Sequence, residues 1–177
     1  LKVRAAGFRN LWTPYAERWV LRHIALDLLA HYLGRAPAER VYAGQIERGD
    51  VSTIEAAILI CDLRGFTAMT DRSERGAIVA LLNRWFERIG AAIQGQRGDI
   101  LKFMGDGLLA VFPVVGDRAA TCDRALDAAL DALARTEALN TELAAEAIAP
   151  LRFGIGLHWG EVEFGNIGTR DRLDFTV

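Results

Sequence analysis

The sequence predicts an α+β domain, an α/β sandwich in which helices cover one face of a mainly antiparallel sheet. Three observations indicate this class. An almost continuous apolar run, residues 55–62, is typical of a strand that is buried on both faces. Residues 74–94 then carry an apolar stripe at helical spacing. Residues 99–113 form two short apolar strands joined at Gly105-Asp106-Gly107, which is a hairpin signal.

The rest of the domain follows the same alternation. Residues 117–147 are rich in alanine and leucine and predict a helix, which we expect to break near Asn140. Residues 151–160 and 161–167 are expected to form a further pair of strands, and a final strand is expected to begin at Arg172. The predicted order is therefore strand, helix, hairpin, helix, strand pair and strand.

A helical arm precedes this domain. Apolar residues recur at helical spacing over residues 11–33, and Gly34 is expected to end that helix. Residues 38–48 predict a second, short helix. We therefore divide the chain into an N-terminal helical arm or linker, residues 1–50, and a domain, residues 51–177. Pairing with a partner, packing on its own domain and contact with a membrane are all open interpretations of the arm.

Composition narrows the functional classes. The 177 residues include 21 Lys and Arg and 23 Asp and Glu, and the formal net charge of −2 argues against a nucleic-acid partner. No segment is long and apolar enough to span a bilayer and no signal peptide is visible, so we expect a cytoplasmic protein with membrane contact only through upstream segments. Because the chain begins at Leu1 and ends within an apolar strand pattern at Val177, we expect a fragment of a longer protein.

Two carboxylates mark a candidate site. Asp62 ends the first strand, and Asp106 lies in the hairpin between the next two strands. Because those strands are expected to be neighbours in the sheet, both side chains should project at the same edge. Adjacent carboxylates repel each other, and a divalent cation removes the repulsion; hard oxygen ligands suit Mg²⁺ or Mn²⁺. Two metal ions bridged by two carboxylates are suited to in-line attack at phosphorus.

The turn after Asp62 predicts a phosphate site. Gly65 frees the backbone, so successive N–H groups can point at one place, and Thr67 adds a hydroxyl donor. The alternative interpretation is a capped turn, in which Asp62 accepts backbone N–H groups and Gly65 is left-handed. The position of Asp106 between two glycines favours the functional interpretation.

Together these residues resemble the catalytic domain of class III adenylate and guanylate cyclases, over roughly residues 54–177. The resemblance implies a ferredoxin-like palm. It also implies the conversion of a nucleoside triphosphate to a 3′,5′-cyclic monophosphate and pyrophosphate on two Mg²⁺ or Mn²⁺ ions per site. The segments that carry the resemblance are Asp62–Thr67, Gly98–Phe112, Leu151–Val162 and Gly165–Gly168.

The resemblance assigns roles to individual residues. Asp62 and Asp106 are expected to be the catalytic metal ligands, together with the backbone carbonyl of Leu63. The groups expected to contact the phosphates are the backbone N–H groups of Gly65, Phe66 and Thr67 and the side chain of Arg152.

In this family, base selection depends on two positions. A lysine before the Gly-Asp motif, with an aspartate or threonine further on, selects adenine, whereas a glutamate and a cysteine select guanine. The corresponding residues here are Lys102 and Thr176, so ATP is the expected substrate. The chemistry agrees, because an ammonium donates to the acceptor N1 of adenine, whereas guanine presents an N1–H donor. The other interpretation of Lys102 is a solvated strand residue.

The resemblance also implies a head-to-tail homodimer through the cyclase domain, with the N-terminal helix as a second candidate interface. Each site would take an asparagine and an arginine from the partner domain, in a segment beyond Val177. We therefore expect this fragment to be inactive or weakly active, because losing an arginine that meets developing charge costs roughly 10³-fold or more.

Three rival interpretations stay open on the sequence. The first is a non-catalytic, cyclase-like module that binds nucleotide and regulates a partner; intact Asp62, Asp106 and Lys102 argue against it. The second is a diguanylate cyclase, whose Gly-Gly-Asp/Glu-Glu-Phe hairpin is missing here. The third is a plain scaffold domain, in which replacing Asp62 has no functional effect.

Overall fold

The computed structural model describes residues 2–71 and 75–177 of the chain, which divide into two compact units. The first unit ends at Glu47 and holds α1 (Lys2–Leu33) and α2 (Arg35–Tyr42). The predicted end of the long helix before Gly34 is confirmed. Among the described residues, no helix combines the length and the apolar composition that a membrane span requires.

The prediction of a second helix over residues 38–48 is wrong in its bounds. That helix is α2, which begins at Arg35 and ends at Tyr42. It starts early because Pro37 falls within its first turn, where the missing N–H of proline has no intrahelical partner to lose.

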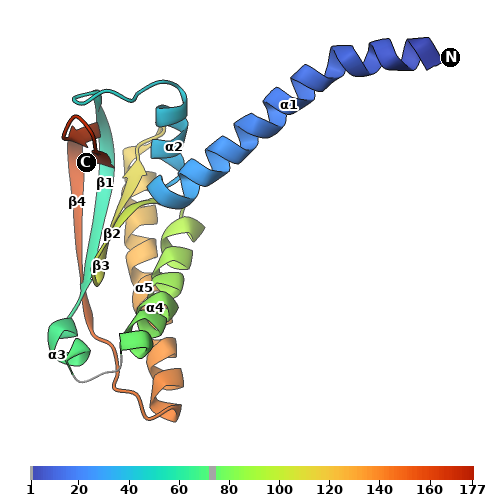
Figure 1. Ribbon diagram of the computed structural model, residues 1–177. Coiled ribbons are helices and arrows are strands. Elements are labelled where there is room, and N and C mark those ends of the chain that lie inside the picture. Colours follow the sequence, from blue (N-terminus) through green and yellow to red (C-terminus); the bar gives the residue numbers. More distant parts are fainter. Residues whose placement is uncertain (1, 72–74) are drawn as a thin grey trace. The chain divides into compact units, whose positions relative to one another are not determined.

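The second unit, residues 48–177, is a sheet with helices on one face, which confirms the predicted fold class (Figure 1). All strand pairs are antiparallel, and the order across the sheet is β2-β3-β1-β4-β5. The strands are β1 (Val51–Leu63), β2 (Asp99–Met104), β3 (Gly107–Pro113), β4 (Phe153–Gly168) and β5 (Leu173–Thr176). The helices are α3 (Phe66–Thr70), α4 (Arg75–Gly95) and α5 (Arg118–Ala145).

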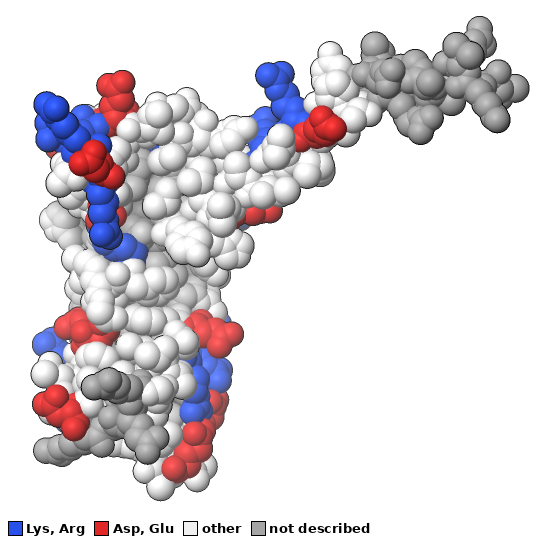
Figure 2. All heavy atoms as spheres, in the orientation of Figure 1, with Lys and Arg blue, Asp and Glu red and all other residues white. Residues whose placement is uncertain are grey.

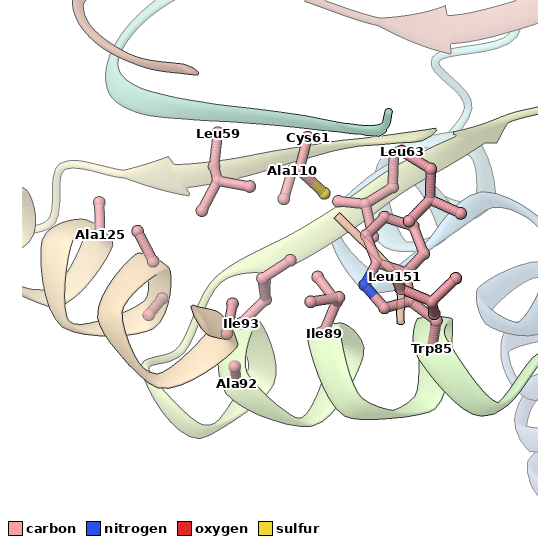
Figure 3. Packing of buried hydrophobic residues seen from close by; sticks show 14 of the residues in the cluster. Leu59, Cys61, Leu63, Trp85, Ile89, Ala92, Ile93, Ala110, Ala125 and Leu151 are labelled. Carbon is pink, nitrogen blue, oxygen red and sulfur yellow. The ribbon is translucent and has the colours of Figure 1, made fainter. Parts of the chain in front are cut away.

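The main core lies between the sheet and the helices α4 and α5. Trp85 and Ile89 of α4 are fully buried in one cluster with alternate residues of β1, among them Leu63 (Figure 3). Trp85 meets Phe153 of β4 edge to face, with the ring centroids 5.5 Å apart. Alanines such as Ala128 line the buried side of α5 and let that helix lie close to the strands. This packing holds the strand ends that carry the candidate site.

The expectation that residues 55–62 are buried on both faces is only partly correct. Residues 56–59 are buried, but Ile60 and Asp62 are exposed. The helices cover only one face of the sheet, so alternate residues at the end of β1 face solvent. The short helix α3, which directly follows this strand end, was not predicted.

The expected strand pair over residues 151–167 is wrong, because these residues belong to one continuous strand, β4. Gly160 does not turn the chain; it lies in register with Ala56 of β1. Gly165 lets β4 lie close to the start of β1, since a side chain at this position would collide with the backbone of Asp50 and Val51. Gly165 thus fits β4 against β1, and neither glycine marks a turn.

The expected break near Asn140 is also wrong, because α5 runs without interruption to Ala145. The Asn140 side chain instead leaves the helix to bond the backbone of Leu151, the residue that leads into β4. Its amide donates to the Leu151 carbonyl at 3.0 Å, and its carbonyl accepts from the Leu151 N–H at 2.7 Å. Asn140 therefore joins the end of α5 to the start of β4.

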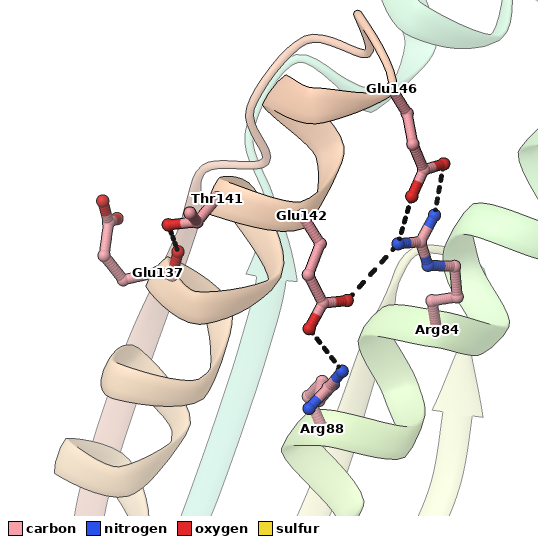
Figure 4. Close-up of polar contacts among 6 residues, drawn as sticks. All are labelled: Arg84, Arg88, Glu137, Thr141, Glu142 and Glu146. Atoms are coloured by element: carbon pink, nitrogen blue, oxygen red, sulfur yellow. Dashed lines mark hydrogen bonds and ion pairs between the residues drawn. The ribbon is translucent and has the colours of Figure 1, made fainter.

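A group of ion pairs links α4 to α5 on the surface. Arg84 donates to both Glu146 and Glu142, and Arg88 donates to Glu142 at 2.8 Å (Figure 4). The hydrogen bonds from Arg84 lower the pKa of Glu146. Because these side chains are exposed, the pairs orient the helices but add little to the free energy of unfolding.

We predict that Asn140→Ala destabilises the domain by about 1–3 kcal/mol, because it leaves the N–H and carbonyl of Leu151 without their partner. Urea unfolding followed by circular dichroism measures the change. Thr141→Ala is the matched control, since the exposed Thr141 hydroxyl bonds only the Glu137 carbonyl of its own helix (Figure 4). Equal midpoints for the two variants would contradict this role of Asn140.

Candidate functional site

The two predicted carboxylates lie at adjoining strand ends. Asp62 is paired in register with Gly107, the first residue of β3, and Asp106 directly precedes that glycine. The Leu63 N–H donates to the Asp106 carbonyl at 3.3 Å, which holds the two segments together. The Asp62 side chain is exposed and that of Asp106 is half-buried. The structure thus brings the backbones of Asp62, Leu63 and Asp106 together where β1 ends and β3 begins.

Gly107 lets the Asp62 carboxylate lean toward the hairpin. A Cβ atom at Gly107 would lie 2.6 Å from the Cys61 carbonyl oxygen and 2.9 Å from Asp62 Oδ1. Contacts this short do not occur in proteins, so only glycine fits here without moving the strand or the carboxylate. This close approach gives a physical reason for the glycine after Asp106.

The turn after β1 contains a left-handed glycine, as the sequence predicts. Gly65 is left-handed, with φ 73°, and directly precedes the helix α3. Phe66 and Thr67 are the first residues of that helix, so their N–H groups have no partner within it. The left-handed glycine is common to both interpretations of this turn, the phosphate site and the capped turn.

Arg152 lies next to this turn. The Arg64 N–H donates to the Arg152 carbonyl at 2.7 Å, so the pairing of β1 with β4 continues one step beyond Leu63. The side chains of Arg64 and Arg152 are both exposed. The candidate phosphate contacts at Gly65, Phe66, Thr67 and Arg152 therefore all lie at or beside the same strand end as Asp62.

Lys102 is not a solvated strand residue. Its ammonium forms an ion pair with Asp174 of β5, and the lysine side chain is only 22% exposed. In the strand order β2 and β5 are opposite edges, so the sheet curls far enough to bring its two edges together here. Thr176 is two residues beyond Asp174 and therefore on the same side of β5. The pairing of Lys102 with Asp174 was missed because it depends on this curvature.

The available donors fit a hard divalent cation. Asp62 and Asp106 offer carboxylate oxygens and Leu63 a backbone carbonyl, which are the ligands that Mg²⁺ and Mn²⁺ prefer. Within the described part of the chain, no cluster of three or more His, Cys, Asp or Glu side chains is placed to hold a metal ion. Burial raises the pKa of the neighbouring Cys61 thiol to about 12, so it is neutral and offers no thiolate ligand.

The distribution of charged side chains on the surface agrees with the nearly equal numbers of acidic and basic residues in the sequence. Figure 2 shows acidic and basic side chains side by side on the visible face, not gathered into a basic patch. The candidate site depends on particular groups at the ends of β1 and β3.

The comparisons with known proteins agree with this geometry. The family described as the adenylate and guanylate cyclase catalytic domain matches residues 51–175, which include both carboxylates and Lys102. The chain belongs to this family. The cyclase domain is 35% identical over 136 residues to an adenylate cyclase of Anabaena cylindrica, an alignment that covers 75% of this chain and 26% of the relative.

Other relatives extend the likeness over the arm. An uncharacterized protein of Mycobacterium tuberculosis is 33% identical over 176 residues, which is 97% of this chain and 30% of that protein. The chain thus spans about a quarter to a third of the length of these curated relatives.

Solved structures place the domain in the cyclase fold, the ferredoxin-like palm. The guanylyl cyclase Cya2 has a TM-score of 0.64 at 30% identity, covering 71% of this chain and 64% of the other. A bacterial light-regulated adenylyl cyclase has a TM-score of 0.70 at 25% identity, covering 94% of this chain and 48% of the other. Since the neighbours include adenylyl and guanylyl cyclases, base preference has to be argued from residues.

We predict that Gly107→Ala destabilises the cyclase domain by about 1–3 kcal/mol, because the added methyl group overlaps the Cys61 carbonyl and the Asp62 carboxylate. The measurement is urea unfolding of the 177-residue chain. Gly156→Ala is the control: it also changes a glycine paired with β1, but its methyl group would lie 4.0 Å from the Ile60 carbonyl oxygen, which is an ordinary van der Waals contact. Equal stability of the two variants would show that Asp62 does not lean over Gly107.

Proposed function

We propose that the parent protein is an adenylate cyclase, which converts ATP to 3′,5′-cyclic AMP and pyrophosphate. The observation that carries the proposal is that Asp62, at the end of β1, lies next to the hairpin that contains Asp106, in a domain of the cyclase family. A second aspartate on the segment that adjoins Asp62 suits a pair of divalent cations more than it suits a structural turn.

Each group at this edge has a role in the proposed reaction. Asp62, Asp106 and the Leu63 carbonyl would hold two Mg²⁺ or Mn²⁺ ions, which would supply positive charge for the 3′-oxygen and the pyrophosphate. The N–H groups of Gly65, Phe66 and Thr67 and the guanidinium of Arg152 orient the triphosphate. Positioning and charge neutralisation account for most of the catalysis.

The groups around Lys102 favour adenine over guanine. The Lys102 ammonium donates to N1 of adenine, and Thr176 lies on the strand that supplies the paired Asp174. Guanine presents N1–H, a donor, at the place where the ammonium needs an acceptor. A donor facing a donor leaves the N1–H of guanine without a partner, and an unpartnered polar group in a binding site is the basis of strong discrimination.

We place the active enzyme in a homodimer formed head to tail through the cyclase domain, with the N-terminal helix as an additional contact. The relatives are about three times as long as this chain, so activity is expected of the full-length protein. In this arrangement the partner completes each site with groups that follow residue 177.

We predict that full-length protein with Mn²⁺ forms cyclic AMP from ATP, and that Asp106→Ala lowers the rate by roughly 10³-fold or more, because the metal ions lose a ligand. The product is identified by chromatography and mass spectrometry. Asp99→Asn, at the far end of β2, is the control and should stay active. ATP binding without cyclisation by the wild-type protein would contradict the proposal and favour a non-catalytic module.

We predict that Lys102→Glu lowers the turnover of ATP by at least roughly tenfold and raises the ratio of GTP to ATP turnover, because it exchanges a donor for an acceptor at N1 of the base. Lys102→Met is the matched control: it removes the donor without adding an acceptor, so ATP turnover falls with no gain for GTP. Full-length protein is assayed with each nucleotide alone and with both in competition. An unchanged base preference in Lys102→Glu would overturn the assignment.

A further inference from the structure

Arg64 lies beside the predicted metal ligands, but no step assigned above uses its side chain. The Arg64 guanidinium covers the backbone of Gly154 in β4: a Cβ atom at Gly154 would lie 2.6 Å from Arg64 Nη2 and 3.2 Å from both Cζ and Nε. The guanidinium thus occupies the space that a side chain at position 154 would take.

Position 154 is directly opposite Asp62 in the pairing of β1 with β4. Side chains at such positions lie on the same face of the sheet, with Cβ atoms about 4.5–5.5 Å apart. Gly107, on the other side of Asp62, leaves space for the carboxylate in the same way. One row across the sheet therefore places the Asp62 carboxylate beside Gly107 and the Arg64 guanidinium over Gly154.

Neither arginine at this strand end is held by an ion pair to a residue that the structure describes. Arg64 is cross-strand from Arg152, joined through its N–H to the Arg152 carbonyl, and like charges at such positions repel. No carboxylate among the described side chains forms an ion pair with Arg64 or Arg152. Two exposed arginines at paired positions, neither of them in an ion pair with a described residue, can offer guanidinium groups to an anion with several oxygens, such as a polyphosphate.

We propose that Arg64 is a further substrate-binding residue, whose guanidinium contacts the triphosphate of the nucleotide from the β4 side of Asp62. The inference rests on the proposed function, because it assumes that the ligand bound next to Asp62 is a nucleoside triphosphate. This explains the glycine at position 154, because the absence of a side chain there lets the Arg64 guanidinium lie against the strand, next to the proposed metal ligands.

The test measures nucleotide binding by the 177-residue chain with Mn²⁺, using a fluorescent ATP analogue displaced by ATP, AMP or inorganic tripolyphosphate. Arg64→Ala should weaken ATP and tripolyphosphate by roughly 10- to 100-fold, the loss of a charge-assisted contact, and AMP much less. Arg64→Lys should recover part of the affinity, because it keeps the charge but not the planar fork. Arg135→Ala, an exposed arginine paired with Asp131 on α5, is the control and should bind like wild type.

Gly154→Ala provides an independent test. Its methyl group would take the place of the guanidinium, so it should weaken ATP to the same degree as Arg64→Ala. The double variant should be no weaker than either single variant, because both remove the same contact. Melting temperatures of all variants are measured, and a loss of ATP affinity at unchanged melting temperature supports binding over a structural role.

The outcomes separate the two proposals. If the wild-type chain binds neither ATP nor tripolyphosphate, this inference falls, whereas the proposed function is decided by the assay of cyclic AMP formation by the full-length protein. If wild type binds ATP and Arg64→Ala binds it within twofold, only the inference on Arg64 is overturned. An equal loss for ATP and AMP also overturns it, because a contact to the outer phosphates cannot affect a monophosphate to that extent.

Discussion

The structure of the site depends on one constraint, the antiparallel pairing of β1 with β3 on one side and β4 on the other. This pairing places Asp62 in one row with Gly107 and Gly154, two positions without side chains. A shift by one residue would turn Asp62 into the core and bring Cys61 to the open face. The buried contacts of Leu59, Cys61 and Leu63 with the helices prevent that shift.

The two faces of the sheet therefore have different roles. The face that meets α4 and α5 supplies the packing, with Trp85 and Ile89 fully buried. The other face carries charged groups at its edge, where they can reach a ligand. A site built on strand ends is held more precisely than one on loops, which suits chemistry that depends on positioning.

Much of this could be predicted from the sequence, because the signals are local. The hairpin at Asp106 and the left-handed Gly65 follow from short-range backbone rules, and the fold class follows from the periodicity of apolar residues. Features that depend on distant segments could not be predicted. The pairing of Lys102 with Asp174 needs the curvature of the whole sheet. Gly160 favours a turn by local rules, but it is paired with Ala56 of β1, and that pairing depends on a segment about 100 residues away.

The central claim is that Asp62 and Asp106 hold divalent cations together. A crystal structure of the chain grown with Mn²⁺ and a non-hydrolysable ATP analogue tests it most directly, through anomalous scattering at the manganese edge. The account predicts anomalous peaks within about 2.0–2.3 Å of carboxylate oxygens from both residues, with the triphosphate in contact with the same ions. Manganese bound elsewhere, or the two carboxylates turned away from each other with the analogue bound, would contradict it.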